Sequence, residues 1–384
     1  MIGGDASASL RHDLLGPVDP AVIAELVDAR LGFLRGKIEE GKYVREDGSA
    51  PTEDERRRLA PVGTLPAMRP ELRVALAPIL LRCAPRLEGL YTPSLDLAFD
   101  RNLCSMLRPQ EPVQVLMPWS DELLLVRSGY VLGWIERGAP LSPPSEAAGP
   151  RAAFVRGPWL VAARDVSVRA DDGQGIRLDF ATRAPVHPEG RGKVWVARDR
   201  GVTSAAADDG GVLVPSERPF TRRALLTDAF AYYGRAYGWG GYQGGRDCSR
   251  FLMDLFADLG VDIPRHSSDQ AIAGEVIEVP AGLPEDERMR AIDAAHRRGV
   301  VFLHFPGHIM LYLGRDDRGV PMALHSFAEY LVPCAGRTPE MAAGDHETLF
   351  TVDRVQVSDL ELGRGSSRTA FIERITKITV FGGR

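Results

Sequence analysis

The hydrophobic positions of residues 20–45 recur at the spacing of an amphipathic helix. They are Val22, Ile23, Leu26, Val27, Leu31 and Leu34. Proline-rich breaks follow, and then a second apolar stretch runs from Leu72 to Leu81. We therefore expect residues 1–95 to form a mostly helical N-terminal region, whose function the sequence does not indicate.

The pattern changes to alternation in residues 111–135, EPVQVLMPWSDELLLVRSGYVLGWI, and again in residues 153–215. Alternating apolar positions with turn residues between them indicate short β-strands. Residues 136–152 are poor in hydrophobic residues and rich in Pro, Gly, Ser and Ala, which is typical of a linker. The sequence thus predicts two small β-barrels, at 96–140 and 150–218. Two generic β-meanders are the alternative.

Residues 220–384 combine both patterns. TRRALLTDAFAYYGRAYG predicts a helix that ends at Gly238. A glycine-rich loop follows, and a second helix is expected to start at or near Cys248, with Asp247 as its N-cap and Gly260 at its end. Its apolar face consists of Phe251, Leu252, Leu255, Phe256 and Leu259.

The loop sequence YGWGGYQGGRDCSRF places a thiol in the first turn of that helix. The positive end of the helix dipole and the free backbone N–H groups favour the thiolate over the thiol. We therefore expect Cys248 to be a nucleophile, although a cysteine at a helix start, seen alone, is more often a small buried residue.

Two histidines on neighbouring strands offer a base for that thiol. VVFLHFPGHIMLYLGRDDRGVPMALHSF predicts three strands separated by turns. In them His308 shares a face with Met310, and His325 shares a face with Phe327. A cysteine at a helix start and two histidines opposite it can serve as nucleophile, base and orienting group. A zinc site made of the same three side chains is the alternative, but no fourth ligand is evident.

The composition of the chain argues against some classes of binding partner. The chain has 384 residues, 44% hydrophobic and 26% charged, and a formal net charge of -5, which argues against binding nucleic acid. No stretch reaches the roughly 18 apolar residues that a membrane-spanning helix needs. The four cysteines are far apart and form no CxxC pair, so we expect free thiols.

The order of these motifs resembles the NlpC/P60 family of papain-like bacterial cell-wall peptidases. The residues that carry the resemblance are YGWGG, DCSRFL, LGVDIPRHSSDQA, GHIMLYLG and LHS. The resemblance implies an α+β fold with a papain-like catalytic domain at 220–384. It implies Cys248 as nucleophile, His308 as general base and His325 as the residue that orients the imidazole. Residues 129–134, GYVLGW, are similar to strand ends of bacterial SH3 (SH3b) domains, so SH3b-like barrels are expected before the catalytic domain.

Members of this family cleave peptidoglycan stem peptides, typically between γ-linked D-glutamate and the following diamino acid. The resemblance therefore implies a cysteine endopeptidase that acts through an acyl-enzyme on stem peptides or muropeptides. It requires no metal or cofactor, and we expect a monomer. A wall-peptide binding module, or an amidase or acyltransferase of the same fold, are the alternatives.

The resemblance also indicates substrate contacts, with departures from the family pattern. They are expected at Tyr237, Trp239, Asp247, Ser249, His266 and Tyr130, and the Cys248 N–H and Tyr237 hydroxyl are expected to bind the oxyanion. Tyr130 would line the far end of the groove from the first barrel. Arg250 stands where the family usually has glycine, and His266 stands where many relatives carry Asp or Asn. Recognition of a free stem-peptide amine by a carboxylate is therefore not expected at residue 266.

The N-terminal segment MIGGDASASLRHDLLG lacks the charged and then apolar layout of a signal peptide. If a signal peptide has been removed, we expect a secreted, periplasmic or cell-envelope protein. Otherwise we expect a cytoplasmic role in muropeptide recycling.

Overall fold

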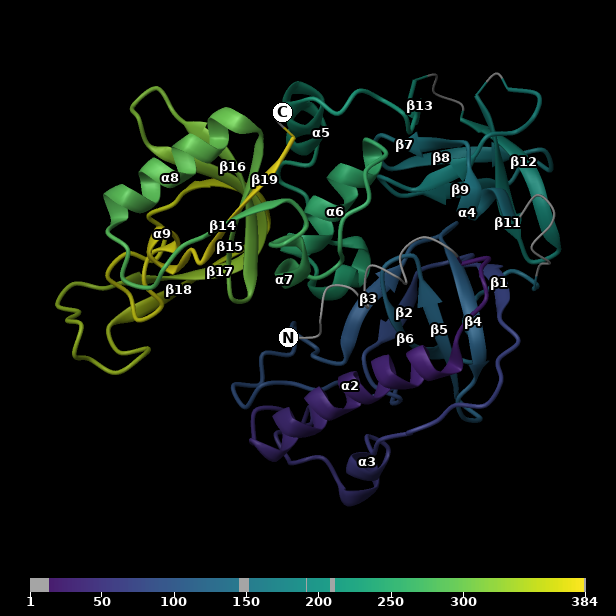
Figure 1. Ribbon diagram of the computed structural model, residues 1–384, viewed down its shortest axis with the longest axis horizontal. Coiled ribbons are helices and arrows are strands. Elements are labelled where there is room, and N and C mark those ends of the chain that lie inside the picture. The colour runs from purple at the N-terminus through teal and green to yellow at the C-terminus, as the bar shows by residue number, and fades with distance from the viewer. Residues whose placement is uncertain (1–13, 145–151, 191, 208–210, 383–384) are drawn as a thin grey trace. The chain divides into compact units, whose positions relative to one another are not determined.

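The structure is a computed structural model that describes residues 14–144, 152–190, 192–207 and 211–382. Residues 1–13 of the N-terminal segment and residues 145–151 of the predicted linker lie outside these ranges. The chain divides into two units, Met1–Glu217 and Arg218–Arg384. Figure 1 follows the chain from the purple N-terminal helix to the yellow C-terminal strands.

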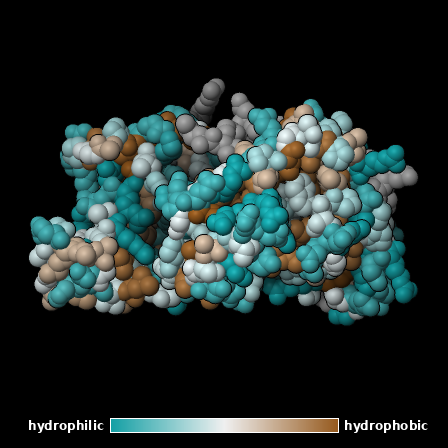
Figure 2. Space-filling model, turned by 90° about the horizontal axis from the view of Figure 1, so that it is seen from below, coloured by the Kyte–Doolittle hydropathy of each residue, from teal (hydrophilic) through white to brown (hydrophobic). Residues whose placement is uncertain are grey.

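Across the described ranges, no helix is both long enough and apolar enough to cross a membrane. On the face displayed in Figure 2, hydrophobic residues form scattered groups among hydrophilic ones.

The predicted N-terminal helix is present as α2(Pro20–Glu39). Asp19 caps it by accepting a hydrogen bond from the Ala21 N–H at 2.9 Å. Its buried residues, among them Val27 and Leu31, share one hydrophobic core with Leu125 and Trp134 of the neighbouring sheet. The helix is thus part of the first β-domain (Figure 1).

The structure corrects the prediction that residues 1–95 are mostly helical. Beyond α2 and the short α3(Glu53–Arg57), the apolar stretch from Leu72 to Leu81 forms β1(Glu71–Val74) and β2(Ile79–Arg82). Alternate residues of both strands are buried, which is the period of a half-buried strand. Both strands belong to the six-stranded sheet β1-β4-β5-β6-β2-β3, so the first β-domain begins well before residue 96.

The remaining strands of this sheet are β3(Leu103–Leu107), β4(Pro112–Pro118), β5(Leu123–Ser128) and β6(Leu132–Glu136). Backbone of β2 and β6 meets closely at Gly133, where an added Cβ would lie 2.4 Å from the Arg82 carbonyl oxygen. Only a glycine allows this approach without a shift of the backbone.

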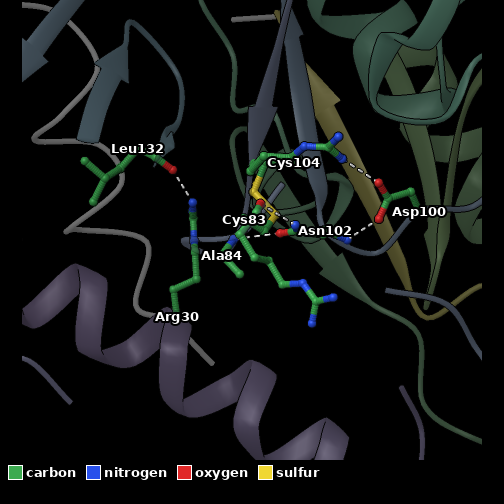
Figure 3. Close-up of a disulfide and its surroundings, with 9 residues drawn as sticks. Arg30, Cys83, Ala84, Asp100, Asn102, Cys104 and Leu132 are labelled. Atoms are coloured by element: carbon green, nitrogen blue, oxygen red, sulfur yellow. Dashed lines mark hydrogen bonds and ion pairs between the residues drawn. A yellow bond between two sulfur atoms is a disulfide. The ribbon is translucent and has the colours of Figure 1, made fainter. Parts of the chain in front are cut away.

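A disulfide joins Cys83, directly after β2, to Cys104 in β3 (Figure 3). The expectation of four free thiols is therefore wrong, and only Cys248 and Cys334 are free among the described residues. The two cysteines are separated by 21 positions, and the pairing of β2 with β3 brings them together. Beside them, the Asn102 side chain accepts from the Ala84 N–H at 2.8 Å, as Figure 3 shows.

The second β-domain of the first unit begins after α4(Ala153–Arg156). Its strands are β7(Trp159–Ala162), β8(Val166–Ala170), β9(Gly175–Leu178), β10(Arg183–Pro185), β11(Lys193–Arg198), β12(Gly201–Ala207) and β13(Leu213–Pro215). They form a three-stranded and a four-stranded sheet around one core. Gln110 joins this domain to the first by bonding both the N–H and the carbonyl of Ala197. The resemblance of either domain to SH3b stays a prediction.

The second unit contains a six-stranded sheet in the order β14-β19-β15-β16-β17-β18. These strands are β14(Glu275–Glu278), β15(Val300–Phe305), β16(His308–Arg315), β17(Pro321–Pro333), β18(Glu347–Asp359) and β19(Lys377–Phe381). The helices are α5(Arg222–Ala231), α6(Cys248–Asp258), α7(Ser267–Gln270), α8(Glu285–Arg298) and α9(Phe371–Arg374). The helix predicted from Cys248 and the three predicted strands are all present.

Helices α6 and α8 pack on opposite faces of this sheet (Figure 1). Phe256 of α6 contacts Phe302, with ring centroids 5.2 Å apart, whereas Ile292 of α8 packs with Val301. Consecutive strand residues point to opposite faces, so the two helices enclose the sheet.

Helix α5 ends at Ala231, earlier than the predicted Gly238. The chain beyond it pairs with β18 instead, because the Gly234 N–H donates to Val355 and the Tyr237 N–H donates to Asp353. This pairing holds the start of the glycine-rich loop against the sheet.

Candidate active site

The glycine-rich loop makes a tight turn immediately before α6. In the turn formed by Trp239–Gly244, Gly240 has a φ of 64° and Gly241 has a φ of 92°. These are left-handed conformations that favour glycine, which explains the Gly-Gly pair in the sequence. The turn brings the Gly240 N–H within 2.9 Å of an Asp247 carboxylate oxygen.

Asp247 is the predicted N-cap of α6, and its side chain is buried. One carboxylate oxygen accepts from the Arg250 N–H at 2.8 Å, while Arg265 donates to both oxygens, at 3.0 and 2.5 Å. Burial alone would raise the pKa of Asp247, but the charge and hydrogen bonds of Arg265 hold it below its ordinary value. The start of α6 is therefore anchored by a buried ion pair.

Ser249 belongs to the same network. Its hydroxyl donates to Asp247 and accepts from Arg265 at 2.8 Å, while its carbonyl accepts from the buried Gln270 side chain at 2.7 Å. Asp247 and Ser249 were predicted to contact substrate. Both side chains help to hold the helix start, a role in which the sequence analysis did not include Arg265 or Gln270, and their contact with substrate stays a prediction.

Arg250, the departure from the family pattern, is buried and ion-paired. Its Nε lies 2.9 Å from one oxygen of Asp254, and the Nε of Arg246 lies 2.8 Å from the other oxygen. Arg246 in turn stacks over the Tyr232 ring at 4.7 Å. The guanidinium of Arg250 thus reaches along α6 to a carboxylate one turn away.

Cys248 is the first residue of α6, as predicted, and is half-buried. Its sulfur accepts a hydrogen bond from the Ile309 N–H, next to His308 in β16. Burial, followed by the charge of Asp247, raises the pKa of Cys248 to about 12. The expectation of a favoured thiolate is therefore wrong for the resting site, because loss of hydration outweighs the stabilising N–H groups.

His308 and His325 form a direct pair. His308 Nε2 and His325 Nδ1 are 2.7 Å apart, and Phe327 stacks on His325 with ring centroids at 4.1 Å. Burial, followed by the charge of Arg374, lowers the pKa of His308 to about 3, and burial also lowers the pKa of His325. Both rings are therefore neutral near pH 7, as a general base must be.

The other ring nitrogen of His325, Nε2, lies 2.9 Å from the hydroxyl of Ser358 in β18. The sequence offered no signal for this residue, since a single serine on a strand belongs to no motif. Both nitrogens of His325 are engaged by side chains, so the zinc alternative would require one of these two contacts to break.

The other predicted contacts are divided between the units. Tyr237 and Trp239 are half-buried in the loop before α6, and His266 is exposed at the start of α7. Tyr130 belongs to the first unit, where its hydroxyl donates to the Met106 carbonyl at 3.4 Å. Its contact with substrate stays a prediction.

Comparison with known proteins finds similarity within the second unit. A family model described as NlpC/P60 family matches residues 234–329. The chain is 33% identical over 150 residues to a gamma-D-glutamyl-L-lysine dipeptidyl-peptidase of Bacillus subtilis, a match that covers 38% of this chain. It covers 47% of that relative, so the chain spans about half the relative's length.

Among solved structures, the chain is similar to an NlpC/P60 endopeptidase from Photobacterium damselae subsp. piscicida. The TM-score is 0.63 at 18% identity, covering 80% of this chain and 72% of that chain. The two proteins therefore share a fold, and the predicted α+β class is confirmed.

Proposed function

We propose that this chain is a cysteine endopeptidase that hydrolyses peptidoglycan stem peptides, a proposal supported by the match of residues 234–329 to the NlpC/P60 family model. The observation that carries the proposal is the placement of Cys248 at the start of α6, beside Ile309, with His308 bonded to His325. A thiol, a neutral imidazole and an orienting group are what acyl transfer through a thioester requires.

In this mechanism the His308 Nδ1 takes the thiol proton, because Nε2 is bonded to His325. The sulfur of Cys248 attacks the peptide carbonyl and forms a C–S bond. The tetrahedral intermediate breaks its C–N bond, and the His308 imidazolium gives its proton to the leaving amine. Water, deprotonated by the same nitrogen, then hydrolyses the thioester. Because thiol and imidazole are both neutral at rest, proton transfer accompanies the attack.

The oxyanion of the intermediate needs hydrogen-bond donors. The backbone N–H of Cys248 lies in the first turn of α6, where N–H groups have no partner within the helix. We assign the Tyr237 hydroxyl as the second donor. Losing one oxyanion donor typically slows turnover about 100- to 1000-fold, so Tyr237→Phe is expected to lower kcat by this order.

We propose the bond between γ-linked D-glutamate and the following diamino acid as the bond that is cleaved. The name of the Bacillus subtilis relative supports this bond type. Trp239 and Tyr130 would contact the stem. His266 supplies no carboxylate for a free peptide amine, so stems that are still attached to the glycan should compete with free stems.

A cell-envelope location follows from this substrate class. It is supported by the disulfide between Cys83 and Cys104, because disulfides persist in oxidising compartments.

The test is mass spectrometry of purified muropeptides after incubation with the full chain. We expect hydrolysed stems with the wild type and with Cys334→Ala, and intact stems with Cys248→Ala. Cys334 is the matched control because it is the other free cysteine in the described ranges. Intact muropeptides together with protein that sediments with cell walls would show a binding module instead. Stems joined to a new amine would show an acyltransferase.

A further inference from the structure

Ser358, near the end of β18, is a buried residue that contacts the histidine pair. The sequence analysis did not include it among the catalytic residues. It lies beyond residues 234–329, which the family model matches. Its Oγ is 2.9 Å from His325 Nε2 and donates to the backbone carbonyl of the neighbouring Asp359 at 2.8 Å. One hydroxyl therefore makes two hydrogen bonds, one to a backbone carbonyl and one to an imidazole.

The carbonyl fixes the direction of both hydrogen bonds. A backbone carbonyl can only accept, and a hydroxyl has a single proton to donate. The Ser358 proton is committed to Asp359, so its oxygen accepts the proton of His325 Nε2. A neutral imidazole carries one proton, which leaves a lone pair on His325 Nδ1.

The same argument extends to the next ring. His325 Nδ1 is an acceptor, so the 2.7 Å hydrogen bond must be donated by His308 Nε2. The remaining nitrogen of His308, Nδ1, then carries a lone pair. This is the nitrogen that the mechanism above requires as the base.

We propose that Ser358 is a positioning residue that sets the tautomers of both histidines, so that the lone pair of His308 is available to the thiol of Cys248. The use of that lone pair rests on the proposed function, whereas the two tautomers follow from the hydrogen bonds alone. Without the hydroxyl, the His325 Nε2–H would be buried with no acceptor. The opposite tautomer would then be favoured, and it would force the proton of His308 onto Nδ1.

The first test is the long-range ¹H–¹⁵N NMR spectrum of the full chain labelled in histidine, which separates Nδ1–H from Nε2–H imidazoles. Signals are assigned with His308→Asn and His325→Asn. We expect both histidines in the Nε2–H form in the wild type and in Ser358→Thr, which keeps the hydroxyl. Ser358→Ala should convert a measurable fraction of both to Nδ1–H. An Nδ1–H form of either histidine in the wild type would overturn the proposal, whatever the variants do.

The second test is the hydrolysis of muropeptides. Leaving a buried donor without a partner shifts an equilibrium by about 10- to 100-fold, so Ser358→Ala should lower kcat by this factor with KM unchanged. Ser358→Thr should stay within about threefold of the wild type. Ser366→Ala is the matched control, because Ser366 is equally buried and its hydroxyl donates to the Gly363 carbonyl at 2.7 Å.

The outcomes separate this proposal from the proposed function. Ser358→Ala with wild-type kcat and wild-type tautomers would overturn the positioning role. If the wild type hydrolyses no muropeptide but both histidines are Nε2–H and respond to Ser358→Ala, the tautomer assignment stands and the proposed function fails.

Discussion

Arg265 holds in place the helix start that carries the nucleophile. Its guanidinium is buried and donates to both carboxylate oxygens of Asp247 and to the Ser249 hydroxyl. These two residues flank Cys248. A planar guanidinium suits this task because its donors match a carboxylate in a fixed geometry.

We predict that Arg265→Met destabilises the second unit by about 3 to 5 kcal/mol, because it leaves the Asp247 carboxylate buried without its cation. The change in the free energy of unfolding would be measured by urea titration, with hydrogen exchange in peptides of residues 218–384 reporting on the second unit. Arg318→Met is the control, since Arg318 lies 3.6 Å from Asp316 in an exposed pair, and such pairs contribute at most about 1 kcal/mol. Equal effects of the two substitutions would contradict the anchoring role.

The raised pKa of Cys248 leads to a second prediction at this scale. Below the pKa of a thiol, the thiolate fraction rises tenfold per pH unit, so alkylation of Cys248 by iodoacetamide should rise about tenfold per unit between pH 6 and 9. The measurement is made in a Cys334→Ala background, with Cys248→Ala as the blank. A rate that is constant between pH 5 and 8 would instead indicate a thiolate–imidazolium pair at rest.

The sequence was informative about residues whose chemistry and local pattern agree. Cys248 follows a capping aspartate and precedes an apolar helix face, and His308 and His325 lie on clearly alternating strands. Ser358 and Arg265 gain their roles only from contacts between distant segments. The acid–base state of Cys248 was predicted wrongly because the helix start is visible in the sequence, whereas the extent of its burial is not.

At the scale of the elements, strands β6 and β2 of the first unit approach each other closely through their backbones. At Gly133 a Cβ would lie 2.4 Å from the Arg82 carbonyl oxygen, which is backbone and cannot rotate away. We predict that Gly133→Ala destabilises the first unit by about 1 to 3 kcal/mol, the usual cost of overpacking.

Gly175→Ala in β9 is the matched control for this change. It adds the same methyl group to a strand of the same unit, at a position with no atom within 4 Å. Removing a glycine from a strand there should be neutral or stabilising by roughly 0.5 to 1 kcal/mol. Thermal unfolding of both variants decides the matter, and a Gly133→Ala variant as stable as Gly175→Ala would refute the close approach.

Two predictions at this scale were wrong for one reason, which is pairing with strands that are distant in the sequence. The stretch from Leu72 to Leu81 was assigned to a helical region because the preceding segment is helical, yet its strands are completed only by pairing with distant strands. Helix α5 stops before Gly238 for the same reason, since residues 234–237 pair with β18. The hydrophobic pattern of a short segment does not show whether a distant strand will pair with that segment.

At the scale of the whole molecule, buried ionisable groups are concentrated in the second unit. His304, His308 and His325 are buried there with lowered pKa values, in each case chiefly because of burial. Groups of this kind stabilise the fold above their unfolded pKa of about 6.5 and cease to do so as pH falls toward their folded values. Asp258 acts in the opposite direction, because burial raises its pKa to about 7 and its folded form binds a proton early.

His296, whose pKa is also lowered chiefly by burial, adds to the effect of these three histidines and outweighs Asp258 with them, so the unfolded second unit binds more protons than the folded one between pH 6 and 5. We predict that the second unit loses roughly 2 to 3 kcal/mol of stability per pH unit in this window. Hydrogen exchange at several pH values would show the loss in peptides of residues 218–384. His304→Gln should reduce the slope by about one third to one half. Stability that does not change across this window would contradict neutral buried histidines.

The disulfide of the first unit imposes a requirement on the second. An environment that keeps Cys83 and Cys104 oxidised also exposes the single free thiol at the start of α6 to oxidants, and this thiol must stay reduced to attack a carbonyl. Peroxides react with thiolates, so the neutral state of Cys248 slows its oxidation. The molecule can thus hold two redox states of cysteine at once. Under dilute hydrogen peroxide, inactivation should be slow near pH 7 and should become faster as pH rises, because the thiolate fraction of Cys248 rises with pH.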